Sequence, residues 1–203
     1  MERSPDRRAR RTKRMLRDAL TELIEEKGVE AVTIKDLADR ADISRGTFYI
    51  HYQDKYDLLE QSEHELLIGV ERVLSTVDKL DAGTALLYVN RNQPFPLILR
   101  LAEYVLQHAK LLRAILGPKG NPSFHMRFKQ VLERNLILHL DYLWQKGEFI
   151  VPKAYLIAYV ISAVLGVMQY WLEYGQEQSV DEIALILSKA TILGPGYVVG
   201  MKG

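Results

Sequence analysis

Residues 33–55 read T-I-K-D-L-A-D-R-A-D-I-S-R-G-T-F-Y-I-H-Y-Q-D-K, and this segment predicts two short helices joined by a tight corner. Thr33 and Asp36 have the spacing of a capping box, in which each side chain accepts a hydrogen bond from the other residue's backbone amide. Ser44 predicts the start of the second helix. Asp42 suits the corner, because aspartate adopts left-handed backbone more readily than most residues. Two helices joined in this way form a helix-turn-helix.

The second of these helices is expected to have two different faces. Phe48 and Tyr52 are four residues apart and are expected to pack into the core. The opposite face carries short or hydrogen-bonding groups that suit a DNA major groove: Arg45, Gly46, Thr47 and Tyr49. Glycine inside a helix costs about 1 kcal/mol relative to alanine, which close approach of the backbone to a partner would explain. The alternative is a helical hairpin with an ordinary polar face.

Extended to Leu59, the segment resembles the DNA-binding domain of the TetR family of bacterial transcription regulators. The resemblance covers about residues 10–60 and combines the capped helices, the corner, the aromatic pair and the trailing lysine in one register. Asp42 departs from the family, which often has glycine in the corner. The rest of the chain resembles the family in layout, and its Y-W-L-E-Y-G followed by S-V-D-E is similar to one common subgroup of the family's ligand domains.

The resemblance implies a set of DNA-binding residues: Thr33, Ser44, Arg45, Gly46, Thr47, Tyr49, His51 and Lys55. Arg45 is the best candidate for reading guanine through O6 and N7. Thr33 is expected to meet a phosphate through its hydroxyl and amide. Tyr49, His51 and Lys55 match positions that bind phosphate in the family, and Lys55 lies where the first turn of a helix favours an anion. For Tyr49 and His51, the alternative is a plain core or surface position.

Apolar residues elsewhere recur at helical spacing, so the chain is predicted to be all-α. Residues 1–56 are expected to form a three-helix helix-turn-helix DNA-binding domain, and residues 57–203 a larger helical domain for ligand binding and dimerisation. A break is expected at Gly83 and at 90–96. The expected helices are 12–27, one from Thr33, Arg45 to about His51, Asp54 to about Leu80, 96–116 with a bend near His108, 122–146, 152–175 and 180–193.

Charge is concentrated at the start of the chain. The whole sequence has a net charge of +1, but residues 1–17 hold eight basic and two acidic side chains. A basic end on a nearly neutral protein suggests an anionic partner, either nucleic acid or a membrane surface. With the family resemblance, residues 7–14 are expected to add sequence-independent attraction to DNA, as an arm that becomes ordered on the duplex.

Enzyme chemistry finds little support in the sequence. Cysteine is absent, which excludes a disulfide framework, a thiolate metal site and a cysteine nucleophile. The five histidines have no metal-ligand spacing, and no phosphate-binding or nucleophile motif occurs. We therefore expect a protein that is not an enzyme and needs no cofactor or metal. The basic N-terminus lacks the apolar segment of a secretory signal, so a cytoplasmic location is expected.

The segment from Ala154 to Leu172 is apolar enough to raise the question of a membrane span. It lacks flanking basic clusters, contains Gly166 and Gln169, and stands alone. A helix that is apolar all round can equally be buried in protein. The preferred interpretation is a helix buried by its own domain and by a second subunit. The rival is a membrane-associated helical protein that uses this segment as an anchor and the basic N-terminus on lipid.

Dimer contacts are expected from 152–174 and 180–193, and the resemblance also implies pairing through the last two long helices. The candidates are Tyr155, Val160, Val164, Val167, Trp171, Ile183, Leu185 and Ile186. Such a homodimer would present two recognition helices to a near-palindromic operator in double-stranded DNA.

The expected function is a repressor that is relieved by an effector in the helical domain. The effector is expected to be an apolar or aromatic small molecule, or a protein partner. Candidate pocket residues are polar-tipped or soft side chains on apolar helices: Tyr104, His108, Met126, His139, Tyr142, Met168 and Trp171. Each of these residues could equally be plain core. An activator or co-activator with the same fold is the alternative to a repressor.

Overall fold

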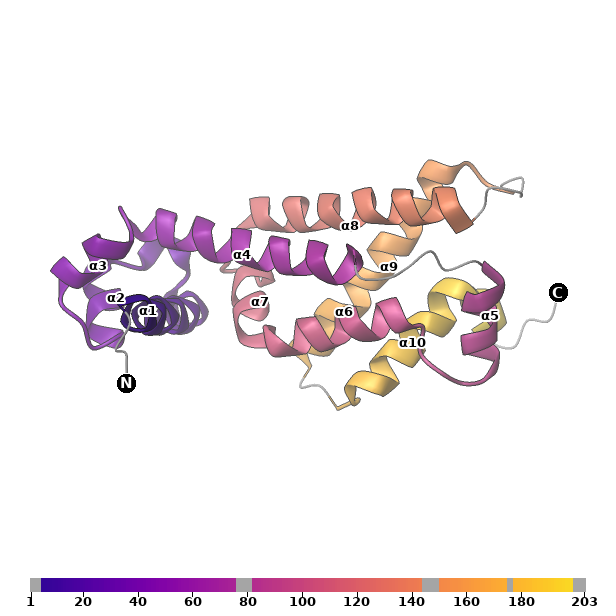
Figure 1. Ribbon diagram of the computed structural model, residues 1–203, viewed down its shortest axis with the longest axis horizontal. Coiled ribbons are helices and arrows are strands. Elements are labelled where there is room, and N and C mark those ends of the chain that lie inside the picture. Colours follow the sequence, from indigo (N-terminus) through magenta and orange to yellow (C-terminus); the bar gives the residue numbers. More distant parts are fainter. Residues whose placement is uncertain (1–4, 76–81, 144–149, 175–176, 199–203) are drawn as a thin grey trace. The chain divides into compact units, whose positions relative to one another are not determined.

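The computed structural model covers the whole chain and describes residues 5–75, 82–143, 150–174 and 177–198. Every element in these ranges is helical, which confirms the predicted all-α class (Figure 1). The elements are α1 Pro5–Lys27, the 3₁₀ turn η1 Val29–Ala31, α2 Ile34–Arg40, α3 Arg45–His51, α4 Lys55–Ser75, α5 Ala82–Asn90, α6 Pro96–Gln107, α7 Ala109–Leu116, α8 Pro122–Leu143, α9 Lys153–Glu173, α10 Val180–Ile192 and α11 Pro195–Val198.

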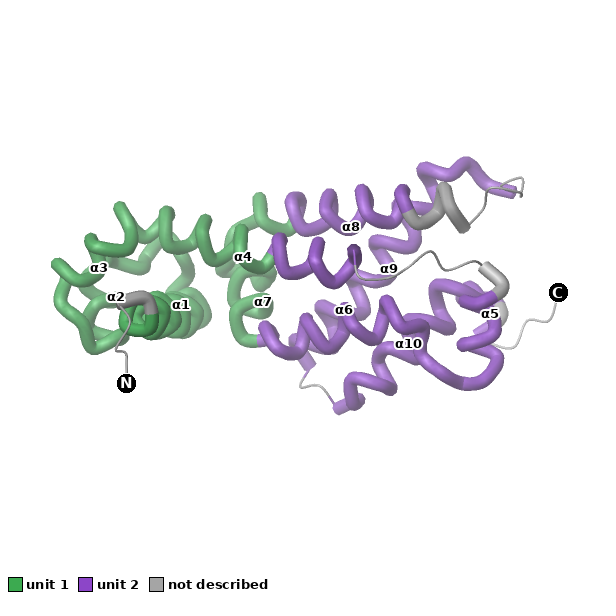
Figure 2. Tube along the Cα trace, in the orientation of Figure 1, with its two compact units in different colours: residues 1–66, 110–125 green, residues 67–109, 126–203 purple. Residues whose placement is uncertain are grey.

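The helices form two compact units that are discontinuous in sequence (Figure 2). Unit 1 contains residues 1–66 and 110–125, and unit 2 contains residues 67–109 and 126–203. The sequence predicts a single cut at residue 56. The compact units differ from this division because α4 up to Leu66, together with nearly all of α7 and the start of α8, belongs to unit 1.

Unit 1 is built around the helix-turn-helix. Helices α2 and α3 pack on α1, with Phe48, Leu20 and Leu37 fully buried between them. Gly28 follows α1 with a φ of +79°, a left-handed conformation that favours glycine and ends the helix. Asp42 has a φ of +51°, so the corner between α2 and α3 uses the left-handed backbone expected of it.

The segment between α7 and α8 completes unit 1. The Lys119 ammonium donates hydrogen bonds to the carbonyl oxygens of Glu25 and Glu26, at 3.1 and 3.0 Å. These carbonyls lie at the C-terminal end of α1, where a cation is favoured. The amide of Val29 donates to the Lys119 carbonyl at 3.3 Å. A segment far away in sequence therefore holds the end of α1.

Unit 2 is organised around α10, which packs against α5, α6 and α9. Ser188 is fully buried on α10, and its hydroxyl accepts a 2.8 Å hydrogen bond from the amide of Phe95, the residue that precedes α6. The same hydroxyl donates to the Ala184 carbonyl at 2.6 Å. The Ser188 hydroxyl therefore gives the Phe95 amide, at the start of α6, an acceptor that the helix itself cannot provide.

Several helices differ in extent from the prediction. α1 begins at Pro5 rather than 12, so residues 7–14 are helical here and not an arm that needs DNA to become ordered. The expected 96–116 helix is interrupted at His108, which ends α6 and separates it from α7. α5 is not expected from the sequence, because it contains Gly83. The expected ends at Leu80, Lys146 and Gly175 fall outside the described residues.

Helix α9 is, in the described ranges, the one helix long and apolar enough to cross a membrane, and 33 % of its most apolar window is buried. Core helices of soluble proteins satisfy the same criteria of length and composition. The apolar character of α9 is therefore weak support for a membrane span.

Candidate nucleic-acid interface

Helix α3 turns one face inward and one outward, as its sequence predicts. Phe48 is fully buried and Tyr52, at the end of the helix, nearly so, with their rings 5.9 Å apart. The outward face includes Arg45 and Tyr49, both exposed. The exposed fraction of Tyr49 is 57 %, although its ring meets the edge of Phe48 at 5.6 Å.

The start of α3 is fixed by its cap. The Ser44 hydroxyl accepts a hydrogen bond from the Thr47 amide at 3.1 Å and lies 2.9 Å from the Thr47 hydroxyl. Gly46 follows the cap, and a Cβ atom there would meet only the Ser44 hydroxyl, at an ordinary 3.7 Å. Packing within the described protein therefore leaves room for a side chain at this position.

Ile50 is a surface residue that sequence reasoning missed. Its side chain is 77 % exposed on α3, beside Tyr49. The signal that could have found it is its spacing of four residues from Gly46 and three from Thr47, which are expected on the outward face. An exposed isoleucine on a helix offered to DNA can contact a thymine methyl group.

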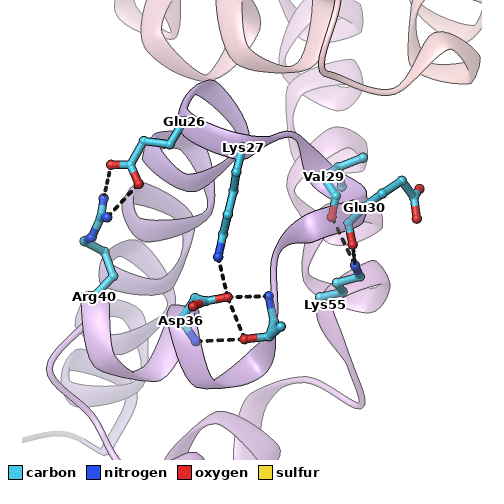
Figure 3. A network of polar contacts seen from close by, with 8 residues as sticks. Glu26, Lys27, Val29, Glu30, Asp36, Arg40 and Lys55 are labelled. Atoms are coloured by element: carbon cyan, nitrogen blue, oxygen red, sulfur yellow. Dashed lines mark hydrogen bonds and ion pairs between the residues drawn. The ribbon is translucent and has the colours of Figure 1, made fainter.

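Thr33 is engaged by the capping box that the sequence predicts (Figure 3). Its amide and hydroxyl donate to one Asp36 carboxylate oxygen at 2.8 and 2.6 Å. Lys27 donates to the same oxygen at 2.7 Å. The hydrogen bond from Lys27, followed by those from Thr33, lowers the pKa of Asp36 well below its usual range. A phosphate contact by either of these Thr33 donors therefore requires that donor to leave Asp36.

Lys55 is tied to the turn η1 (Figure 3). Its ammonium donates to the carbonyl oxygens of Val29 and Glu30, at 3.1 and 2.7 Å. It also lies 4.9 Å from the centre of the Tyr56 ring. An ammonium has three donors, so Lys55 holds the first turn of α4 against η1 and keeps one donor beyond these two carbonyls.

Arg40 braces α2 against α1. Its guanidinium makes two hydrogen bonds of 2.9 Å to the Glu26 carboxylate, the fork shown in Figure 3, and a further one of 2.8 Å to Glu22. The hydrogen bond from Arg40 lowers the pKa of Glu26. This bidentate pair orients the first helix of the helix-turn-helix.

A basic groove of about 670 Å³ lies along α1 in unit 1. Its lining is dominated by cations, with Glu65 as its one acidic side chain among the described residues: Arg7, Arg10, Arg11, Lys13, Arg14, Arg17, Tyr52, Ser62 and Glu65. Arg17 pairs with Glu65, and the Lys13 ammonium lies 5.6 Å from the Tyr52 ring. Burial raises the pKa of Tyr52 to about 12. The groove favours an anion, and Tyr52 joins it to the end of α3.

Unit 2 contains a separate, apolar cavity of about 400 Å³. Its lining comes from the end of α4 and from α5, α6, α8, α9 and α10, and includes Leu101, Asn135, Ile161 and Thr191. Within the described ranges, no group of three or more histidine and acidic side chains is placed to hold a metal ion.

The residues expected to form a ligand pocket lie elsewhere. The Tyr104 and His108 ring centres lie 4.5 Å apart with the ring planes tilted by 45°, and Met126 is exposed. Met168 and Trp171 are buried on α9, with the Trp171 indole donating to the Gln178 carbonyl at 2.9 Å. None of these five lines the cavity. The side chains of His139 and Tyr142 lie outside the described residues.

The expected dimer residues divide between core and surface. Val164, Trp171 and Ile183 are buried in the core of their own protomer. Tyr155 and Ile186 are exposed, and Val160, Val167 and Leu185 are half-buried. The outer side of α9 continues through exposed residues at helical spacing: Tyr155, Tyr159, Ser162, Gly166 and Tyr170. A Cβ atom at Gly166 would meet nothing within 4 Å, so the middle of this row is open.

Comparisons with known proteins match both parts of the chain. Residues 16–61 match the family described as bacterial regulatory proteins, tetR family, and residues 92–192 match the transcriptional regulator C-terminal region. The HTH-type transcriptional regulator YxbF of Bacillus subtilis is 24 % identical over 123 residues, which cover 61 % of this chain and 30 % of YxbF. This chain therefore spans less than a third of that relative.

Solved structures share the fold at low sequence identity. The chain is 18 % identical to NalD of Pseudomonas aeruginosa, a secondary repressor of the MexAB-OprM multidrug efflux pump, with a TM-score of 0.67 over 93 % of this chain and 97 % of NalD. It is 14 % identical to FadR of Bacillus subtilis, solved with stearoyl-CoA, with a TM-score of 0.62 over 89 % of this chain and 97 % of FadR.

Proposed function

The chain belongs to the TetR family of DNA-binding bacterial transcription regulators, and from this premise we propose that it is a cytoplasmic, homodimeric repressor whose hold on a near-palindromic operator is relieved by an effector. The observation that carries the proposal is the outward face of α3, where Arg45, Tyr49 and Ile50 are exposed on a helix whose other face is buried. A helix with these properties is suited to enter a major groove.

We propose a role in DNA binding for each residue of this face and its neighbours. Arg45 reads a guanine, and the backbone at Gly46 comes close to the duplex because no side chain stands in the way. Tyr49 and His51 contact phosphates beside the groove. Lys55 uses its remaining donor in the same way, while the start of α4 is held by Val29 and Glu30. The basic groove along α1 supplies attraction that does not depend on sequence.

The exposed side of α9 supports the homodimer. Tyrosine is enriched at protein–protein interfaces, and three exposed tyrosines recur along this side of the helix. Ser162 and Gly166 lie at its centre, where small side chains allow two helices to approach closely. Together with Ile186 on α10, this row can form a four-helix contact with its symmetry mate. This contact would also cover the apolar helix that raised the question of a membrane.

Relief of repression requires an effector that binds two conformations of the protein with different affinity. The apolar cavity of unit 2 is the best-formed candidate for its site. NalD is a repressor and FadR was solved with stearoyl-CoA, which supports this type of regulation in a protein of the same fold. The operator-bound state is then the one that the effector binds more weakly.

Footprinting of the purified protein on genomic DNA tests the proposal. We expect protection of a near-palindrome with half-sites about one helical turn apart, or a multiple of it. Arg45→Ala is expected to weaken binding by roughly 5- to 150-fold, which corresponds to the loss of one bidentate base contact of about 1–3 kcal/mol. Arg91→Ala, which changes an exposed arginine of unit 2, is the matched control.

A reporter gene behind the protected site then gives the direction of regulation. Its transcription rises when a repressor is deleted and falls when an activator is deleted. If transcription falls when the gene for this protein is deleted, the protein is an activator and the repressor proposal is wrong. A protein that protects no specific site, or binds vesicles in place of DNA, would contradict the proposal as a whole.

A further inference from the structure

The cavity of unit 2 differs in chemistry from the groove of unit 1. Six helices contribute to its lining: Leu74 of α4, Ala85 and Leu86 of α5, Leu97, Ile98 and Leu101 of α6, Leu132, Asn135 and Leu136 of α8, Leu156, Val160, Ile161 and Val164 of α9, and Thr191 and Ile192 of α10, with Phe95 before α6. Its volume of about 400 Å³ is at the small end of the range for ligand pockets. It can hold one small molecule.

Two polar side chains occur in the described lining, and both already donate to the backbone of their own helices. The Asn135 amide donates to the Val131 carbonyl at 2.8 Å. The Thr191 hydroxyl donates to the Leu187 carbonyl at 2.7 Å. The Thr191 hydroxyl has donated its one proton, so its oxygen can only accept a hydrogen bond from a ligand.

No titratable residue is among the described lining residues. A carboxylate, phosphate or ammonium group taken into this cavity would lose its hydration without gaining an opposite charge, which is strongly unfavourable. A hydrocarbon chain would lose only its unfavourable contact with water when it enters the cavity. It would also make van der Waals contacts with the aliphatic side chains of the walls.

We infer that the cavity binds a neutral, chiefly hydrocarbon molecule with at most one hydroxyl group, of the size of a medium-chain alcohol. This inference rests on the proposed function, because it names the chemical class of the effector. It adds that the ligand carries no charge at neutral pH and that a hydroxyl group donates its hydrogen bond to Thr191.

Thermal melting of the full chain with three probes of equal length tests the charge selectivity. The probes are 1-decanol, sodium decanoate and decylamine at the same concentration and pH 7. Binding to the folded protein alone raises the melting temperature, and a concentration of about 100 times Kd gives a rise on the order of 5 °C. We expect decanol to raise it and the two charged probes to leave it unchanged or lower it. Equal stabilisation by a charged probe, or none by decanol, would overturn the inference.

A variant that fills the cavity tests whether decanol binds there. Ala85→Phe puts a ring into the space beside the α5 wall and is expected to weaken decanol binding at least 10-fold. Ala154→Phe, at an exposed position on α9 outside the lining, is the matched control and is expected to bind decanol as the parent does. Where Ala85→Phe does not melt cooperatively, Ile98→Trp on the α6 wall replaces it. Unchanged affinity in a folded lining variant would contradict the site.

A gel-shift assay of operator binding, with and without decanol, tests this inference separately from the proposed function. Decanol that stabilises the protein and releases the operator supports both. Decanol that stabilises the protein without changing operator affinity supports the ligand class and contradicts relief of repression by this ligand. Failure to bind any operator contradicts the proposed function whatever the melting experiment shows.

Discussion

The side-chain amide of Asn121 donates a 2.9 Å hydrogen bond to the carboxylate of Glu63, whose residue is 1 % exposed. Asn121 precedes α8 and Glu63 lies on α4, so the bond joins two segments of unit 1 that are 58 residues apart. A buried carboxylate needs hydrogen-bond donors, because its hydration has been removed. Glu63 therefore makes the position of α4 in unit 1 depend on the segment between α7 and α8.

Asn121→Ala is expected to lower the free energy of unfolding by about 1–3 kcal/mol, because it removes a hydrogen-bond donor to a buried carboxyl group. Urea denaturation followed by circular dichroism measures the effect. Gln130→Ala, at an exposed position on α8, is the control and should change stability by less than about 0.5 kcal/mol. Stability equal to that of the parent would show that Asn121 is not needed to satisfy Glu63.

The hydrogen bonds to the Asp36 carboxylate are expected to make the stability of the folded protein decrease in acid. Hydrogen bonds from Lys27 and Thr33 lower the pKa of this carboxylate in the folded protein, so its contribution is fully present above its unfolded pKa of about 3.9 and is lost as the pH falls below that value. Asp36→Asn should therefore be less stable than the parent at pH 7, with the difference shrinking as the pH falls below about 3.9. Asp39→Asn, an exposed neighbour on α2, is the control. A difference independent of pH would contradict the electrostatic explanation.

The caps of α2, α3 and α10 could be predicted because each is made by residues three apart in sequence. Thr33 and Asp36 form a reciprocal capping box, as do Ser179 and Glu182, and Ser44 caps α3 alone. The buried pair Phe48 and Tyr52 could be predicted for a similar reason, since residues four apart share a face of a helix.

Contacts between distant segments could not be predicted. Two examples are the hydrogen bond from Lys119 to the end of α1 and the hydrogen bond from Asn121 to Glu63. Both depend on how the chain folds back on itself, and the local spacing of residues does not encode this. The cavity shows the same limit. The sequence predicts pocket residues with polar tips such as Trp171, whose indole donates to the Gln178 carbonyl, whereas the lining of this cavity is chiefly aliphatic. Aliphatic residues carry no signal in a sequence that separates a cavity wall from a filled core.

The basic groove predicts the salt dependence of DNA binding. Arg7, Arg10 and Arg14 share one side of α1 over roughly 10 Å. Replacing all three by alanine should reduce the slope of the logarithm of the DNA-binding constant against the logarithm of the salt concentration, by about 0.9 for each phosphate that the protein no longer neutralises. The same replacement should weaken binding to operator and non-operator duplexes alike. Fluorescence anisotropy at several salt concentrations measures both quantities, with Arg91→Ala as the control. A weakening confined to the operator would assign these arginines to base recognition instead.

The proposed dimer contact through the outer row of α9 can be tested by substitution. Val164 is buried within the protomer, so a charge there would disrupt the fold and not test the interface. Tyr159 and Ile186 are exposed, and Tyr159→Glu combined with Ile186→Glu should keep the protomer folded while burying two unpaired charges in each half of the contact. Sizing with light scattering should give a folded monomer that binds the operator at least 10-fold more weakly, because the two recognition helices no longer act together. Met126→Glu, exposed on α8, should remain dimeric. A stable dimer in the double variant would place the interface on another surface.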